Sequence, residues 1–155
     1  MLEEKRLSDR TPLESALYRL QYKSLPGNAV FYFVPGKQGS TSVGSRWVNW
    51  ACSIPVTEEA LPHFLVDRHG QRHEHSLPHG SMQPEEETRL KALMREHLPA
   101  YFAEIVSDSQ DTFAQPIYSV TVPANAVGRV ALLGDAGTVA PPFTGSGVFK
   151  AILNP

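Results

Sequence analysis

The 155-residue sequence has one cysteine, no long apolar run and no excess of either charge. A single cysteine, Cys52, excludes an internal disulfide and is typical of a protein from a reducing compartment. No apolar run approaches the ~18 residues of a membrane span. The first ten residues alternate acidic and basic side chains, unlike the apolar stretch of a secretory signal. We therefore expect a soluble, cytoplasmic protein without a membrane partner.

The charge balance argues against a nucleic-acid partner. Fourteen basic and 16 acidic residues give a net charge of −2, and no basic footprint of the kind that binds phosphate backbones is present. The length and the 41% hydrophobic content fit a globular protein, which at this size buries roughly two-thirds of its unfolded surface. The composition predicts one ordinary core.

Two segments rich in β-forming residues predict an antiparallel pair of strands. They cover residues 29–35 and 46–55 and are separated by a glycine-rich loop. Side chains alternate between the two faces of a strand. The alternation predicts one face with Val48, Trp50, Cys52 and Ile54, and a second with Trp47, Asn49, Ala51 and Ser53.

A helix is predicted from Pro84 to Leu98. Pro84 is suited to the first helical turn, three glutamates follow it, and Pro99 ends the pattern. Weaker patterns predict four further elements: a short helix over 12–20, a hairpin joining 64–66 to 73–77, a strand within 113–122, and a short buried strand over 129–133. The expected class is α+β, with a mostly antiparallel sheet and one long helix.

Two clusters of potentially reactive residues have simpler explanations. The glycines around Lys37 and Ser40 are not in the order of a phosphate-binding loop, so they predict a strand connection. The histidines at 69, 73, 75 and 79 lie in a charged segment without a nearby cysteine. We predict a solvated hairpin rather than a zinc site. Cys52 lies in mid-strand and is expected to pack in the core.

The segment 132–147, LLGDAGTVAPPFTGSG, is the strongest candidate for a binding site. Gly134 allows close backbone approach at a strand end, and Asp135 offers only acceptors, which suits the hydroxyls of a polyol or ribose. Gly145 and Gly147 precede an expected helix start, whose N–H groups could meet a phosphate or a ring edge. The spacing of these glycines and of Asp135 fits equally well a strand, turn and helix that bind no ligand.

Read together, residues 129–151 resemble the second flavin-contacting motif of the class A FAD-dependent aromatic hydroxylases, the para-hydroxybenzoate hydroxylase-like group. Thr138 stands where the family has histidine. Four further segments, YFVPGKQGSTSVGSRWVNWA, LPHGSM, QPIYSVTVP and GRVALLGDAG, are similar in the same order to the 2,6-dihydroxypyridine hydroxylase branch. The matching motif positions are Gly134, Asp135, Ala136, Pro141, Pro142, Gly145 and Gly147.

The resemblance implies roles for individual residues. Asp135 would accept a hydroxyl of the flavin ribityl chain, within a cofactor-binding set of Gly134, Asp135, Pro141, Gly145, Gly147, Val148 and Phe149. Pro142 and Phe143 would lie between the flavin ring and the substrate. Further pocket candidates are Trp47, Asn49, Gln115 and Tyr118. The implied domains are a polar lead-in (1–24), a substrate-binding-type sheet domain (25–128) and a flavin-contacting strand, turn and helix (129–155).

The implied activity is hydroxylation of a phenol or hydroxypyridine with FAD, NAD(P)H and O2. The family also binds FAD through an amino-terminal βαβ unit with Gly-x-Gly-x-x-Gly, a motif that these 155 residues lack. The resemblance thus predicts the carboxyl-terminal portion of such an enzyme, inactive alone, with weak or no FAD binding. Its expected partners are a separate FAD-domain polypeptide and a second copy of itself. The alternative is a non-enzymatic remnant that self-associates and binds an aromatic ligand.

Overall fold

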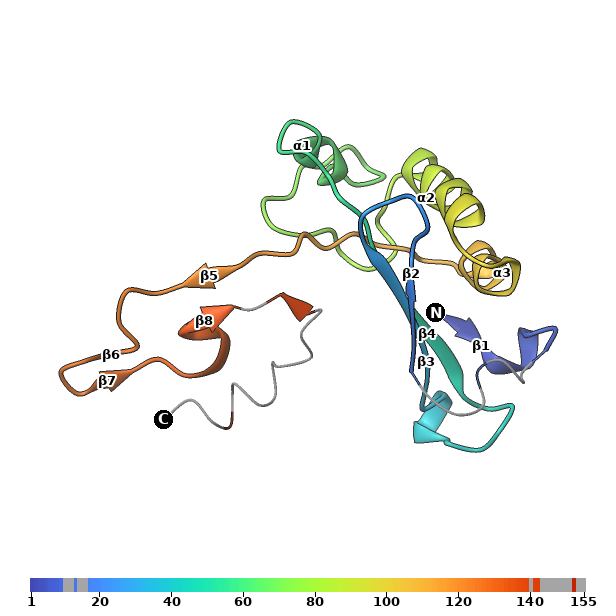
Figure 1. Cartoon of the computed structure of the whole chain (residues 1–155), viewed down its shortest axis with the longest axis horizontal. Coiled ribbons are helices and arrows are strands. Elements are labelled where there is room, and N and C mark those ends of the chain that lie inside the picture. The colour runs from blue at the N-terminus through green and yellow to red at the C-terminus, as the bar shows by residue number, and fades with distance from the viewer. Residues whose placement is uncertain (10–12, 14–16, 140, 143–151, 153–155) are drawn as a thin grey trace. The chain divides into compact units, whose positions relative to one another are not determined.

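The computed structural model describes residues 1–9, 13, 17–139, 141–142 and 152. The chain forms two compact units, residues 1–114 and residues 115–155 (Figure 1). Among the described residues, no helix has both the length and the apolar character that crossing a bilayer requires.

The first unit contains a four-stranded antiparallel sheet. Its strands are β1 (Leu2–Glu3), β2 (Tyr18–Gln21), β3 (Asn28–Val34) and β4 (Trp47–Ser53), in the order β1-β4-β3-β2. The predicted pair of strands is confirmed as β3 and β4, and their register runs from Asn28 opposite Ser53 to Val34 opposite Trp47. Two short 3-10 turns, η1 (Glu4–Arg6) and η3 (Lys37–Gly39), flank the sheet.

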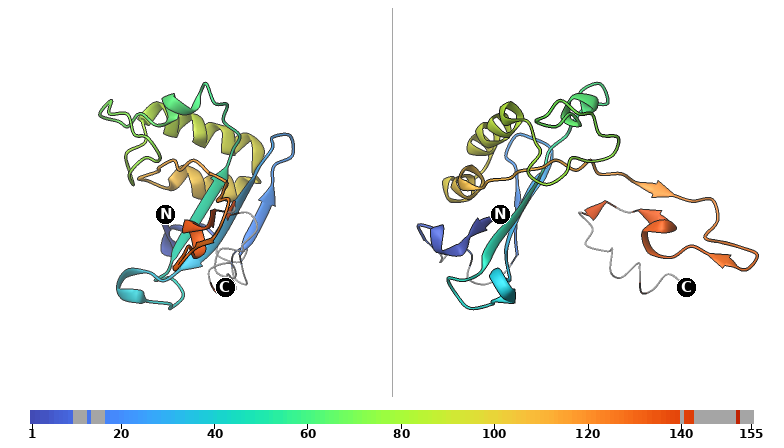
Figure 2. Two further views of the ribbon diagram at one scale, coloured as in Figure 1. Left: turned by 90° about the vertical axis from the view of Figure 1, so that its left-hand side faces the viewer. Right: turned by 180° about the vertical axis from the view of Figure 1, so that it is seen from behind.

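Two helices, α2 (Pro84–His97) and α3 (Ala100–Asp108), cover one face of this sheet (Figures 1 and 2). The short helix α1 (Leu61–Phe64) follows β4 in the chain. The predicted α2 is confirmed, with Pro84 as its first residue and three glutamates in its first turn. The α+β class predicted from the sequence is therefore confirmed.

The core lies between the sheet and the helices. Phe31 of β3 and Val48 of β4 are completely buried, as is Met94 of α2. The Phe31 ring packs on the Phe102 ring of α3, with centroids 4.8 Å apart. Burying apolar side chains of this size is the main favourable term in folding. The helix-facing alternation of β4, with Val48, Trp50 and Cys52 inward, is as the sequence predicted.

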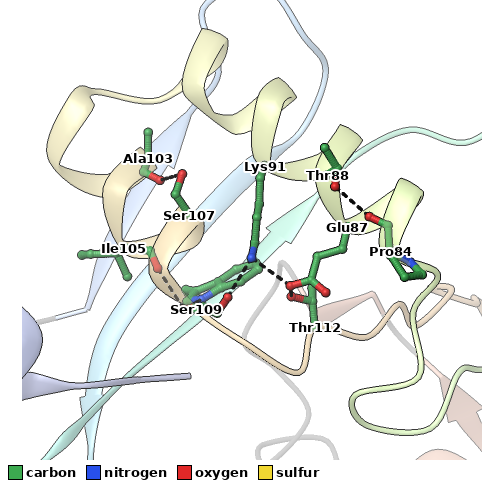
Figure 3. A network of polar contacts seen from close by, with 10 residues as sticks. Pro84, Glu87, Thr88, Lys91, Ala103, Ile105, Ser107, Ser109 and Thr112 are labelled. Atoms are coloured by element: carbon green, nitrogen blue, oxygen red, sulfur yellow. Dashed lines mark hydrogen bonds and ion pairs between the residues drawn. The ribbon is translucent and has the colours of Figure 1, made fainter. Parts of the chain in front are cut away.

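A polar network joins α2, α3 and the sheet (Figure 3). The Lys91 ammonium pairs with Glu87 at 2.9 Å and donates to the Ser109 carbonyl at 2.9 Å. The Glu87 carboxylate also accepts from the Thr112 hydroxyl at 2.8 Å, and the Trp50 indole donates to the Ser109 hydroxyl at 2.7 Å. Buried polar groups need such partners. The network therefore fixes the end of α3 against β4.

A buried ion pair joins the amino-terminal segment to the sheet. The Glu4 side chain is fully buried, and its carboxylate accepts from the Arg46 guanidinium at 2.7 and 2.9 Å and from the Gly44 N–H at 2.8 Å. The hydrogen bonds from Arg46 hold the pKa of Glu4 below its usual value, against the opposing effect of burial. Arg46 also lies over the Phe33 ring at 3.9 Å.

Several sequence-based expectations differ from the structure. The residues expected to form a polar lead-in include strands β1 and β2, because Leu2, Tyr18 and Leu20 pack with the core. Of the helix expected over 12–20, residues 18–20 belong to β2, and residues 12 and 14–16 lie outside the described part of the chain. Phe64 ends α1 rather than joining a hairpin strand; the expected hairpin is reduced to one bridge between Val66 and Arg72. Helix α3 was not predicted at all.

The strands described in the second unit have two residues each. They are β5 (Val120–Thr121), β6 (Ala126–Val127), β7 (Val130–Ala131) and β8 (Thr138–Val139), paired β5 with β8 and β6 with β7. The strand expected within 113–122 therefore belongs to a separate two-stranded sheet. The strand expected to be buried over 129–133 is short and exposed, with Val130 66% and Leu133 55% exposed.

The thiol of Cys52 is expected to be unreactive in the folded chain. Burial raises its pKa to about 12, whereas a free cysteine titrates near 8.5. The thiolate fraction at pH 7 falls by about three orders of magnitude, and alkylation by iodoacetamide should slow in proportion. Measuring labelling by mass with and without urea tests this; a native rate equal to the unfolded rate would contradict the packing role.

Candidate functional site

The face of the sheet turned away from the helices carries the candidate pocket residues of the first unit. Since β3 and β4 place Phe31, Val48 and Trp50 toward the helices, the alternate residues lie on the other side. We call this the outer face. It consists of Val30, Tyr32 and Val34 of β3 with Trp47 and Asn49 of β4, all half-buried.

A hydrogen bond lies in the middle of the outer face. Asn49 stands directly opposite Tyr32 in the register of β3 and β4. The Asn49 amide nitrogen donates to the Tyr32 hydroxyl oxygen at 2.8 Å. This contact orients both polar groups beside Val30, Val34 and Trp47. The register adds two charged residues to the same face, Arg19 opposite Val30 and Glu3 opposite Trp47. Apolar side chains with a few oriented polar groups are typical of small-molecule sites.

Two tryptophans of β4 occupy opposite environments. Trp50 faces the helices, where its indole N–H donates to the Ser109 hydroxyl. Trp47, three residues earlier, lies on the outer face and stands opposite Val34. The alternation of side chains thus places one tryptophan against the helices, with a structural partner, and the other on the outer face. The sequence predicted this separation.

The glycine–aspartate turn belongs to the second unit. After β7, Gly134 takes a positive φ of 59° and begins the 3-10 turn η4 (Gly134–Ala136). This is the left-handed conformation that glycine adopts most easily. The Gly137 N–H donates to the Gly134 carbonyl at 3.3 Å, and β8 follows immediately. Asp135, at the centre of the turn, is exposed.

The base of this turn is tightly closed. A side-chain carbon at Gly137 would come within 3.1 Å of the Asn125 side-chain oxygen and of the Leu132 carbonyl oxygen. The Leu132 N–H donates to the Asn125 carbonyl at 2.7 Å. These contacts fix the backbone on either side of η4, and they therefore fix the position of Asp135 within the turn. Its carboxylate offers acceptors only, which suits ligand hydroxyl groups.

The structure places the remaining predicted site residues as follows. Gln115 and Tyr118 are exposed and precede β5 in the second unit, so they do not share an element with Trp47 and Asn49. Pro141 and Pro142 follow β8; Pro142 is exposed. The predicted residues outside the described part of the chain are Phe143, Gly145, Gly147, Val148 and Phe149.

The histidine segment has local partners. His73 pairs with the Asp67 carboxylate at 2.9 Å, and this hydrogen bond lowers the pKa of Asp67. The same carboxylate accepts from the His69 and Gln71 backbone N–H groups, which closes the turn. The rings of His79 and Phe113 lie against each other, with centroids 3.9 Å apart and planes tilted by 45°. Within the described residues, no group of three or more metal-binding side chains was found.

Sequence reasoning missed one residue of the outer face. The sequence predicts a strand that contains Tyr32 and identifies its partner Asn49, but not Tyr32 itself, as a candidate pocket residue. The signal was available, because an antiparallel register places a residue of one strand directly opposite one of the next. The register itself could not be predicted, because the loop between the two strands is long. The structure pairs Tyr32 with Asn49.

Comparison with solved structures supports the fold. The structure of 2,6-dihydroxypyridine-3-hydroxylase from Arthrobacter nicotinovorans aligns with a TM-score of 0.71 and 23% identity, over 87% of this chain and 33% of that one. PqsL from Pseudomonas aeruginosa aligns with a TM-score of 0.48 and 21% identity, over 88% of this chain and 34% of that one. The chain spans about a third of the length of these structures. A comparison with curated proteins found no match.

A family model completes the assignment. The model described as FAD binding domain-like matches residues 1–119, which include the whole sheet with its outer face and the helices α1 to α3. The match covers well over half of the sequence. The chain belongs to the FAD binding domain-like family.

Proposed function

We propose that this chain supplies the substrate-side sheet and one flavin-contacting turn of an FAD-dependent aromatic-ring monooxygenase. The reaction would hydroxylate a phenol or hydroxypyridine with NAD(P)H and O2. The observation that carries the proposal is the outer face, where the oriented pair of Tyr32 and Asn49 lies beside Trp47 on a sheet of the FAD binding domain-like family. The similarity to 2,6-dihydroxypyridine-3-hydroxylase supports the fold that this function uses.

The residues of this chain have positioning roles in the proposed reaction. The outer face would hold the substrate ring and exclude water from it. Asp135 would accept a ribityl hydroxyl, and its exposed position in η4 fits an acceptor of this kind. FAD, when bound, supplies the chemistry that activates oxygen. No side chain of this chain is assigned an acid, base or nucleophilic role.

FAD binding is expected to require a dinucleotide-binding unit in addition to this chain. The phosphates of FAD commonly bind at a glycine-rich turn before a helix, and the sequence contains no Gly-x-Gly-x-x-Gly. The test begins with the coding sequence that flanks or adjoins this reading frame. A polypeptide encoded there that carries Gly-x-Gly-x-x-Gly is then produced together with this chain, and bound flavin is measured by its absorbance.

Replacing Asp135 with alanine is expected to reduce flavin retention by the reconstituted protein at least tenfold. The reason is the loss of a charge-assisted hydrogen bond to the ribityl chain, worth about 1.5–3 kcal/mol. Asp108→Ala, an exposed carboxylate in the last turn of α3, is the matched control and should retain flavin fully. Equal retention by wild type and Asp135→Ala would show that the turn has another role.

A self-associating, ligand-binding module is the second candidate function. The observation that favours it is the exposed apolar surface of the second unit, where Val127 is 73% and Val130 66% exposed. Clustered exposed apolar side chains commonly mark a surface that a partner covers. Light scattering distinguishes the two candidate functions. It is measured on the purified chain alone and together with the polypeptide that carries Gly-x-Gly-x-x-Gly. Dimers that persist without flavin would favour self-association.

A further inference from the structure

Residues 36–46, in the glycine-rich loop between β3 and β4, hold an anion that belongs to the chain itself. The glycines and Lys37 are not in the order of a phosphate-binding loop. The loop nevertheless donates hydrogen bonds to the carboxylate of Glu4, whose side chain has no exposed surface. A carboxylate removed from water needs donors in place of its hydration. The loop therefore contains a built anion site, which the proposed reaction does not use.

Four N–H groups of the loop meet this carboxylate. Glu4 Oε2 accepts from the Gly44 backbone N–H at 2.8 Å, from Arg46 Nε at 2.9 Å and, at a longer 3.4 Å, from the Arg46 backbone N–H. Glu4 Oε1 accepts from Arg46 Nη2 at 2.7 Å. Two guanidinium N–H groups on two oxygens form the fork that fits a planar carboxylate. A phosphate carries two further oxygens that need partners of their own, so this donor set favours a carboxylate.

Contacts within the first unit hold these donors in place without Glu4. The Gly36 N–H donates to the Ser40 carbonyl at 2.8 Å. A side-chain carbon at Gly36 would collide with the Ser45 carbonyl oxygen, so the two ends of the loop are in contact. The Arg46 guanidinium lies over the Phe33 ring of β3, 3.9 Å from its centroid. A site that is arranged before its ligand arrives loses little in binding it. We therefore expect the donors to stay in place when the Glu4 carboxylate is removed.

We propose that residues 36–46 form a carboxylate-binding site, of which Glu4 is a replaceable ligand. Glu4 reaches the site from η1, 40 residues before Gly44 and 42 before Arg46 in the chain. The ligand and its site therefore belong to different segments. Formate, the smallest carboxylate, fits the space that the CH2–COO⁻ end of Glu4 leaves when the residue is replaced by alanine. It would accept from the same N–H groups as Glu4. The site shares no residue with Asp135 or the pair of Tyr32 and Asn49, so it is independent of the proposed function.

Urea unfolding of the whole chain at pH 7, followed by tryptophan fluorescence, tests the proposal. Both tryptophans lie in β4, which begins directly after Arg46. Glu4→Ala should lower the urea midpoint, because the buried guanidinium loses its counterion. Sodium formate at about 0.2 M should restore about half of this loss or more, as a ligand of the folded state does. Sodium chloride and sodium phosphate at the same ionic strength should not. If Glu4→Ala is unfolded in chloride, formate should make it fold.

Three control variants separate binding at this site from a general effect of salt. Glu4→Gln removes the charge but fills the space, so formate should raise its midpoint no more than that of wild type. Glu4→Ala combined with Arg46→Gln removes the guanidinium fork and should lose the response to formate. Glu3→Ala removes a carboxylate that pairs with Lys5 at the surface, and its response should equal that of wild type.

Three outcomes would overturn the proposal. They are equal responses of Glu4→Ala and Glu4→Gln to formate, an unchanged response after Arg46→Gln, and equal restoration of Glu4→Ala by formate and by chloride or phosphate. The last would mean a general anion effect rather than a carboxylate site. None of these measurements involves flavin or an aromatic ligand, so their failure would leave the proposed function as it stands.

Discussion

Replacing Glu4 with glutamine is expected to lower the free energy of unfolding of the first unit by about 3 kcal/mol. The Glu4 carboxylate is fully buried and meets the Arg46 guanidinium through two hydrogen bonds. Removing one partner of a buried pair leaves the other charge without its counterion. The value is at the lower end of the range for such pairs, because the Arg46 side chain remains 21% exposed.

Tryptophan fluorescence during urea unfolding measures this loss in the intact chain. Both tryptophans lie in β4, so the signal reports on the first unit alone. The neighbouring Glu3→Gln variant is the control. Glu3 pairs with Lys5 at the surface, where the side chains are 36% and 65% exposed, and such pairs contribute little. Equal midpoints for Glu4→Gln and Glu3→Gln would contradict the importance of the buried pair.

The same pair predicts a direction for the pH dependence. The pKa of Glu4 is lower in the folded chain than its ordinary value of 4.5, first because of the hydrogen bonds from Arg46. The ionised carboxylate therefore stabilises the fold fully above pH 4.5, and this contribution is lost as the pH falls through the lowered pKa. The difference in stability between wild type and Glu4→Gln should shrink below pH 4.5.

Phe31→Ala is expected to cost about 3–5 kcal/mol, or to prevent folding of the first unit. The Phe31 side chain is completely buried, and its ring packs on the Phe102 ring at 4.8 Å between centroids. Alanine would leave a cavity between the sheet and α3 and remove an aromatic pair. Urea unfolding followed by tryptophan fluorescence gives the size of the effect.

Two further variants keep this prediction measurable. Phe31→Leu fills most of the space and should lose less than half as much stability as Phe31→Ala, so it remains folded for analysis. Val30→Ala, on the adjacent half-buried position of the outer face, should cost about 1 kcal/mol or less. Similar losses at positions 30 and 31 would mean that the core is not on the side of the sheet that packs against the helices.

The parts of the fold that the sequence predicted well have strong local signals. Strands β3 and β4 are dense in β-branched and aromatic residues and are bounded by Pro-Gly and Pro. Helix α2 has proline at its start and apolar residues at helical spacing. The alternation that separates Trp47 from Trp50 follows directly from the geometry of a strand. Local chemistry decides all three features.

The missed elements depend on distant contacts. Strand β1 has two residues and exists because Leu2 pairs with Val48 across the sheet. Helix α3 has no charged or capping residue at its start, and Pro99 before it predicts the end of the helix that begins at Pro84. Its burial of Phe102 and Ile105 against the sheet stabilises it. Tertiary packing overrides weak local propensity in such segments.

The sequence identified individual candidate residues of the site, but not the contacts between them. The sequence predicted Asn49 and Trp47 on one face, which the structure confirms, but not the contact from Asn49 to Tyr32. For Asp135 the sequence predicted an acceptor at a strand end, and η4 fixes the backbone that carries it. Its role toward FAD stays a prediction.

In the strand order β1-β4-β3-β2, the pairing of β1 with β4 is the one that closes a long loop and loses the corresponding chain entropy. The pairs β2–β3 and β3–β4 join neighbours in the chain, so little backbone freedom is lost in bringing them together. Only β1 must be brought back across the intervening segments to reach β4. The entropy lost in closing that loop is not recovered by two residues of strand pairing. The ion pair between Glu4 and Arg46, immediately beside β1, is the contact placed to offset it.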